Sequence, residues 1–210
     1  MSLETLVAAC ATRIEETHTA REQALAISRA LVRQCANTIR ATHRASYDEA
    51  ATMLAEARQT AARLRAAVSD KPNLLSAGYT QDALKEYTEA ALVYAFLTGD
   101  TLPTAEQLDV EPAAFLNGMA EAASELRRAI LDRLRRGAVT ESEHLLTMMD
   151  DSYSLLMTLD YPEAVTGGLR RSTDALRGVL ERTRGDVTSA LRQERLLGAL
   201  AAFEERVSRS

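Results

Sequence analysis

The first 71 residues of this chain contain neither glycine nor proline, the two residues that most readily end a helix. One helix of that length would extend roughly 100 Å, so a compact chain must turn within it. Ser46 and Glu49 fit the reciprocal side-chain cap that opens helices, which predicts a turn near residues 44–46. Thr19 and Glu22 fit the same pattern and mark either another break or a surface section of one long helix.

The rest of the chain has helical spacing and helix-ending signals at intervals. We predict further helices over residues 46–68, 80–98, a short one opened by Thr104 and Gln107, 112–137, 140–162 and 166–200. No segment alternates apolar and polar residues as a half-buried strand would. Apolar residues make up 46% and aromatics only 4%, so the core is built mainly from small aliphatic side chains. The sequence therefore predicts an all-α fold of about seven helices, with residues 1–210 as a single domain.

Composition also bears on location and partners. The chain has no basic-then-apolar leader and no run of the ~18 apolar residues that a membrane span needs, so we expect a cytoplasmic protein without membrane contact. Cys10 and Cys35 show no metal-binding spacing, and we interpret them as two buried thiols in a reducing compartment. Net charge is −5, so any attraction for nucleic acid depends on how the charges are distributed.

A basic stripe lies on the first helical region. Its members are spaced by four, four, three and four residues and so share one helix face: Arg29, Arg33, Asn37, Arg40 and Arg44. No acidic residue occurs between Glu22 and Asp48, so the helix itself supplies no partners within the stripe. Two interpretations stay open: a strip that contacts phosphates with little sequence discrimination, or a face paired with another helix. A second basic cluster, residues 127–136, also complements a helix dipole, which favours a structural role.

Four glutamates form two pairs, each on one helix face. Glu86 and Glu89 are three residues apart, and Glu121 and Glu125 are four apart. Glu89 precedes an uncharged run, residues 90–97, so we expect partial burial, which requires a cation, a metal or a proton. Small residues around Glu121 would let another helix approach closely. Oxygen ligands suit Mg²⁺ or Mn²⁺, and these ions polarise phosphodiesters and activate water. The alternative to a metal site is an ion pair, such as Glu125 with Arg128.

Several segments, in this order and spacing, resemble the translin superfamily, which comprises translin and its catalytic partner, the translin-associated protein. They cover nearly the whole chain: residues 21–33 with the Arg-rich continuation to 44, residues 86–99, residues 115–127, Arg136-Gly137, Tyr161-Pro162 and residues 168–174. The resemblance implies an all-α bundle of about seven helices, octamer-like shells with an interior cavity, and binding of single-stranded RNA or single-stranded DNA.

The same resemblance assigns roles to residues. In the translin-associated subunit, two acidic pairs bind Mg²⁺ and cleave RNA inside the shell. Glu86 and Glu89 match the first pair, Glu125 matches the last acid of the second, and Glu121 stands where that subunit has Asp. Translin itself is a non-catalytic binder, and the sequence Ala-Ser-Glu-Leu around Glu125 looks more like translin.

Three hypotheses follow from these observations. The first is a Mg²⁺- or Mn²⁺-dependent endoribonuclease for single-stranded RNA, with Glu86, Glu89, Glu121 and Glu125 as metal ligands and catalytic residues. The second is a non-catalytic translin-type protein that binds single-stranded RNA or DNA. In both, the contacts to nucleic acid come from Arg21, Arg29, Arg33, Arg40 and Arg44. The third is a helical scaffold whose arginines make salt bridges between subunits. We also expect a homo-oligomer, of octamer type.

Overall fold

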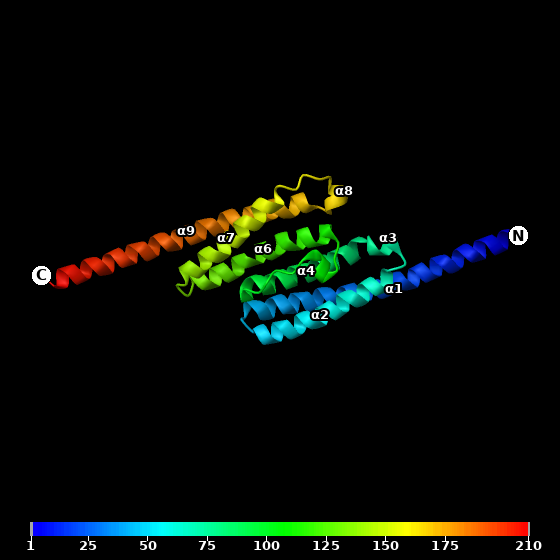
Figure 1. Ribbon diagram of the computed structural model, residues 1–210, viewed down its shortest axis with the longest axis horizontal. Coiled ribbons are helices and arrows are strands. Elements are labelled where there is room, and N and C mark those ends of the chain that lie inside the picture. The colour runs from blue at the N-terminus through cyan, green and yellow to red at the C-terminus, as the bar shows by residue number, and fades with distance from the viewer. Residues whose placement is uncertain (1, 210) are drawn as a thin grey trace. The chain divides into compact units, whose positions relative to one another are not determined.

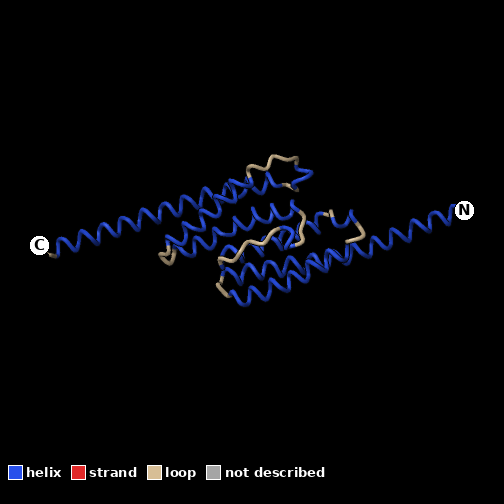
Figure 2. The backbone as a smooth tube through the Cα atoms, in the orientation of Figure 1, coloured by secondary structure: helices blue, strands red, loops and turns tan. Residues whose placement is uncertain are grey.

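The structure is a computed structural model that describes residues 2–209, and the only regular elements in that range are helices (Figures 1 and 2). The all-α prediction is confirmed. Within residues 2–209 there are six long helices, which are α1 (Leu3–His43), α2 (Tyr47–Val68), α4 (Gly78–Thr98), α6 (Pro112–Leu134), α7 (Val139–Leu156) and α9 (Leu169–Ser208). Three helices of four residues lie between them, namely α3 (Pro72–Leu75), α5 (Ala105–Leu108) and α8 (Glu163–Thr166). Helices α3 and α8 are the two that the sequence did not predict.

The chain divides into two compact units, the first ending at Met119 and the second beginning at Ala120. The division falls inside α6, which continues as one helix across it. The single domain expected over residues 1–210 stays a prediction, because this division describes compactness and not independent folding.

In the first unit, α1, α2 and α4 pack against one another (Figure 1). The turn expected near residues 44–46 is confirmed, with Ala45 in the left-handed region at φ 58°. The cap pattern at Ser46 is wrong in detail, since the Ser46 side chain makes no cap hydrogen bond. At Thr19 the helix does not break, so the polar patch there is the surface section of one long α1.

Other helix ends follow local sequence signals. Gly99 ends α4 with φ 80°, a left-handed conformation that costs glycine little. Thr104 and Gln107 cap each other at the start of α5, as predicted. Pro112 opens α6, where its missing N–H loses no helical hydrogen bond.

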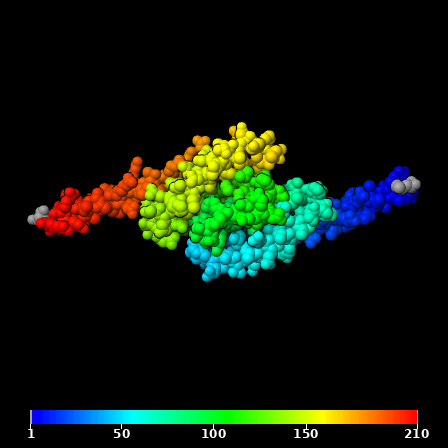
Figure 3. Space-filling view, in the orientation of Figure 1, coloured from blue at the N-terminus to red at the C-terminus, as the bar shows by residue number. Residues whose placement is uncertain are grey.

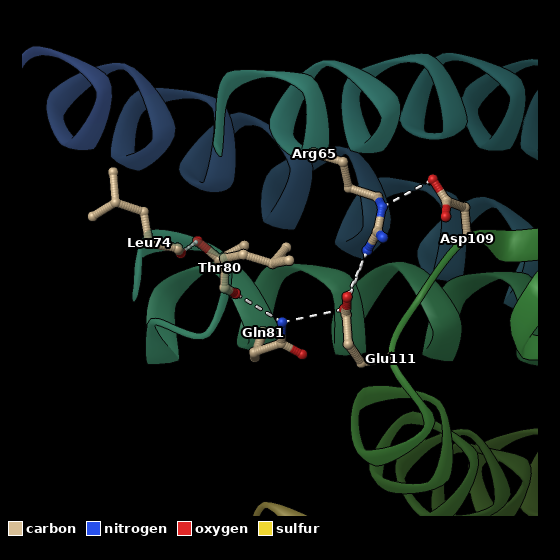
Figure 4. Close-up of polar contacts among 7 residues, drawn as sticks. Arg65, Leu74, Thr80, Gln81, Asp109 and Glu111 are labelled. Atoms are coloured by element: carbon tan, nitrogen blue, oxygen red, sulfur yellow. Dashed lines mark hydrogen bonds and ion pairs between the residues drawn. The ribbon is translucent and has the colours of Figure 1, made fainter. Parts of the chain in front are cut away.

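A polar network on Arg65 fixes the start of α6 within the first unit (Figure 4). Arg65 Nε lies 2.9 Å from Asp109 Oδ2, and Arg65 Nη1 lies 2.9 Å from Glu111 Oε1. Gln81 Nε2 donates to Glu111 Oε2 over 3.2 Å. Burial opposes ionisation of Glu111, but the hydrogen bonds from Arg65 and Gln81 outweigh it and lower the pKa of that carboxyl. The connection that precedes α6 is thus held to both α2 and α4.

In the second unit, α7 packs against α9, and the core includes Leu145, Met149, Leu176 and Leu180. An ion pair between Arg184 Nη2 and Asp150 Oδ1, 2.6 Å apart, joins the two helices at the surface. Helix α9 is unbroken through Gly185.

Both terminal stretches of helix extend beyond the packed part of their own unit (Figure 3). In α1 every residue from Leu3 to Glu16 is exposed, and in α9 every residue from Arg192 onward that the structure describes is exposed. Cys10 therefore lies at the surface, which corrects the expectation of two buried thiols; Cys35 is buried as expected. Across residues 2–209, every helix is too short or too polar to cross a bilayer.

Candidate functional site

Glu86 and Glu89 project from one face of α4, a helix whose other faces supply much of the core of the first unit. Glu89 is only 9% exposed, which confirms the expectation of burial from the uncharged run that follows it. Glu86 is half-buried, with the Lys85 ammonium 3.7 Å from its carboxylate. A carboxylate as buried as Glu89 requires compensation for lost hydration.

The first turns of α6 approach α4 unusually closely. A Cβ added at Gly118 would lie 2.8 Å from the Lys85 carbonyl oxygen and 2.8 Å from Thr88 Cβ. Only glycine allows this spacing, because any side chain there would meet backbone. The expectation that small residues near Glu121 admit a neighbouring helix is met at this position. Glu121 follows Gly118 by three residues and therefore lies on nearly the same side of α6.

Three carboxylates form a cluster. One oxygen from each of Glu86, Glu89 and Glu121 lies within 4.8 Å of the others. Ligand oxygens of a Mg²⁺ ion lie about 2.0–2.1 Å from the metal, so two of them are at most roughly 4.2 Å apart. The observed limit of 4.8 Å between the three oxygens is close to that separation. The donor set consists of hard oxygens with partial burial, which fits Mg²⁺ or Mn²⁺.

Glu125 lies one turn beyond Glu121 on α6 and is half-buried. Among the described residues, the cluster comprises Glu86, Glu89 and Glu121. The assignment of Glu125 as a further ligand stays a prediction.

Cys35 on α1 lies close to the acid pair of α4, which the sequence did not indicate. Burial, followed by the negative charges of Glu86 and Glu89, raises the pKa of its thiol well above the ordinary value. The thiol therefore stays protonated at neutral pH. The position of Cys35 on the buried face of α1 was the available signal in the sequence. Its proximity to Glu86 and Glu89, more than 50 positions away along the chain, is set by packing.

The basic stripe of α1 lies at the surface, with all five predicted arginines exposed. Arg21 pairs with Glu22 over 2.6 Å, and Arg44 Nη2 lies 3.4 Å from Glu49 at the start of α2. Arg40 donates to Asn37 within the stripe. Arg29 and Arg33 take part in no ion pair with any residue from 2 to 209. These two adjacent cations of the stripe are therefore not neutralised by an acidic residue within residues 2–209.

The second basic cluster is largely neutralised within its own unit. Arg127 Nη1 lies 2.8 Å from Asp186 Oδ2 and donates to the Thr183 hydroxyl. Arg133 approaches Glu141 to 3.5 Å, and Arg135 approaches Asp132 to 3.3 Å. These contacts favour the structural role expected for this cluster.

No protein-family model matches the chain. An uncharacterised protein of Methanocaldococcus jannaschii is 32% identical over 120 residues, which are 57% of this chain and 54% of that protein. The chain thus spans about half the length of this curated relative.

Solved structures match a larger share of this chain than that relative does. The crystal structure of AfC3PO is 32% identical with a TM-score of 0.83, and the complex of AfC3PO with duplex RNA is 33% identical with a TM-score of 0.81. Each match covers 90% of this chain and 98% of the other. The crystal structure of apo-NeC3PO, 18% identical with a TM-score of 0.79, shares the fold over 90% of this chain and 99% of the other.

Proposed function

Because the chain belongs to the translin family, as a homologue of the prokaryotic C3PO proteins, we propose that it binds RNA and cleaves it as a Mg²⁺-dependent endoribonuclease. Glu86, Glu89 and Glu121 hold the metal, with Glu125 as a further ligand. The carboxylate cluster is the observation that carries the proposal, since the three oxygens lie within 4.8 Å of one another and Glu89 is buried.

In this proposal the acidic residues bind the metal and the basic residues bind the RNA backbone. When bound, the divalent cation polarises the scissile phosphodiester and activates water. Glu89, held rigidly by its burial, fixes one side of the site, and Glu86 and Glu121 complete it from two helices. The exposed Arg29 and Arg33 bind backbone phosphates, which gives affinity with little sequence discrimination. No histidine is needed for this chemistry.

A cleavage assay with matched variants tests the nuclease. Labelled single-stranded and duplex RNA are incubated with Mg²⁺, with Mn²⁺ or with a chelator; the duplex is included because AfC3PO forms a complex with one. We expect Glu89→Gln and Glu121→Gln to lower cleavage at least 100-fold, as expected for loss of a group that a metal centre requires. Glu106→Gln, on the exposed surface of α5, is the control. Undiminished cleavage by Glu89→Gln refutes the assignment.

Metal binding is measured separately from activity. Titration calorimetry with Mn²⁺ is expected to show binding to the wild type and loss of binding in Glu89→Gln. Equal Mn²⁺ binding by both proteins contradicts the proposed ligand set.

RNA binding without chemistry is the second candidate function, and the free cations of Arg29 and Arg33 support it independently of the acids. The Arg29→Ala/Arg33→Ala variant is expected to reduce the slope of log affinity against log salt by roughly 1.4, or ~0.7 per phosphate contact on a single strand. Arg135→Ala/Arg177→Ala removes the same charge elsewhere and serves as the control. Salt-dependent binding without cleavage in any metal identifies a non-catalytic binder, and failure to bind RNA at low salt leaves the scaffold hypothesis.

A homo-oligomer is proposed from the exposed end of α1. Along the whole of α1, apolar or small residues recur at alternating spacings of four and three, with Arg21 as the one charged member. We call this row of residues the seam. The seam is buried in the first unit at Ala24, Ser28, Leu31, Cys35, Thr38 and Thr42. The same seam continues to the N-terminus through Leu3, Val7, Cys10, Ile14 and Thr17, where Leu3 is 81% exposed and Ile14 is 69% exposed. Such a coiled-coil pattern requires a facing helix.

The N-terminal seam therefore packs against another copy of the chain. In Val7→Glu/Ile14→Glu both charges lie on the seam, whereas in Thr12→Glu/Thr19→Glu they lie on the opposite face with the same spacing. Analytical ultracentrifugation is expected to show smaller assemblies for the seam variant only. Identical sedimentation of both variants contradicts this interface. The octamer expected from the resemblance stays a prediction that the same experiment measures.

A further inference from the structure

A hollow of about 430 Å³ lies on the first unit between α1 and α4, apart from the carboxylate cluster. Leu25 and Val32 of α1 and Ala83 of α4 form its apolar walls. Ligand sites in proteins are typically hollows of this size, with mostly apolar walls and a few polar groups that fix orientation.

Two hydroxyl groups in this hollow have no hydrogen-bond partner. Ser28 is only 4% exposed, and both its hydroxyl oxygen and that of Tyr79 are buried without a partner. Elsewhere on α1, Thr38 and Thr42 each donate to the carbonyl four residues earlier. The Ser28 hydroxyl makes no such bond. Leaving a buried hydroxyl unpaired is unfavourable, so these two groups indicate a polar ligand that pairs with them.

The rim of the hollow is charged. Arg29 and Arg33, which make no ion pair with the described residues, line it together with Asp82. All three side chains are exposed, and two cations against one anion leave the rim net positive. An anionic group is thus attracted to the edge of a hollow whose interior is apolar with two unpaired hydroxyls.

We propose that this hollow is a nucleotide subsite: the base of one unpaired nucleotide enters between α1 and α4, and its phosphate binds Arg29 and Arg33. The apolar walls contact the faces of the base, as unstacked bases are commonly held. A hydroxyl both donates and accepts, so Ser28 and Tyr79 pair with the amino and carbonyl groups at the base edge. This inference rests on the proposed RNA binding and adds contact with a base to contact with phosphates.

The experiment compares strands with and without bases. Affinity is measured by fluorescence anisotropy, in chelator to prevent cleavage, for a single-stranded RNA octamer and for an abasic strand of equal length and charge. Full-length wild type, Ser28→Ala and Tyr79→Phe are compared. Each substitution removes an unpaired hydroxyl, so the variants are expected to melt at the same temperature as the wild type or higher. Tyr47→Phe is the control, since the Tyr47 hydroxyl already donates to the Leu97 carbonyl.

We expect the wild type to bind the octamer more tightly than the abasic strand. Ser28→Ala and Tyr79→Phe are expected to weaken octamer binding roughly three- to tenfold, as for loss of one hydrogen bond, and to leave abasic binding unchanged. Equal affinity of the wild type for both strands, or unchanged octamer binding by both variants, overturns the subsite while leaving phosphate binding by the stripe intact. Altered sedimentation with unaltered binding also overturns it, because the hollow then receives a partner chain.

A second probe separates this inference from the proposed function. Saturation-transfer NMR with AMP, GMP, CMP and UMP detects contact between a base and the protein without any RNA strand. Contact that Tyr79→Phe weakens supports the subsite even if RNA neither binds nor is cleaved. Absence of contact with all four mononucleotides, together with no preference over the abasic strand, overturns it.

Discussion

Replacing Gly118 by alanine tests how closely α6 must approach α4. The added Cβ would lie 2.8 Å from the Lys85 carbonyl oxygen, 2.8 Å from Thr88 Cβ and 3.0 Å from Thr88 Cγ2. The carbonyl belongs to the backbone of α4 and cannot rotate away, so the helices must separate. Overpacking of this kind costs about 1–3 kcal/mol, and alanine returns about 1 kcal/mol through its higher helix propensity. The expected net loss is therefore up to about 2 kcal/mol.

Urea denaturation measures this loss, and the melting temperature is expected to fall by up to roughly 8 °C. The matched control is Gly185→Ala in α9, where an added Cβ meets no atom within 4 Å. Because that substitution brings only the propensity gain, it is expected to stabilise by up to about 1 kcal/mol. If Gly118→Ala stabilises as much as Gly185→Ala, the close approach inferred here is wrong.

Two further results are expected. Glu111→Gln should cost about 1 kcal/mol at pH 7, since it removes the carboxylate that Arg65 and Gln81 bind. The pKa of Glu111 is lower in the folded state than its unfolded value near 4.5. Its contribution to the free energy of unfolding is therefore complete above pH 4.5 and is lost as the pH falls through the folded-state pKa. The urea denaturation curves of variant and wild type should differ at neutral pH and converge in acid. In Val7→Glu/Ile14→Glu, where the seam is expected to lose its partner copy, iodoacetamide at pH 8 should alkylate Cys10, which is exposed in the single chain, and spare Cys35, whose pKa burial raises. Equal labelling of the two cysteines by mass spectrometry would contradict the packing of α1.

The sequence by itself determined the features that arise from neighbours along the chain. The long helices, the turn before Ser46, the cap at Thr104 and the helix end at Gly99 all follow from local propensity and capping. The shared face of Glu86 and Glu89 follows from helical periodicity alone. Local signals left two alternatives open at Thr19, a break or a surface section of one long helix, and the structure has the second. At Thr19 the chain continues as helix, because no residue there favours ending it.

Tertiary packing decided the relations between distant residues. Cys10 and Cys35 occupy the same seam of α1, yet only Cys35 has α2 and α4 packed around its part of the helix, so only it is buried. Arg44 forms an ion pair with Glu49 only because the chain reverses direction between them. The proximity of Glu121 to the acid pair of α4 depends on an interhelical spacing that Gly118 permits. Periodicity fixes which face a side chain takes, but the distance between two helices depends on every side chain packed between them.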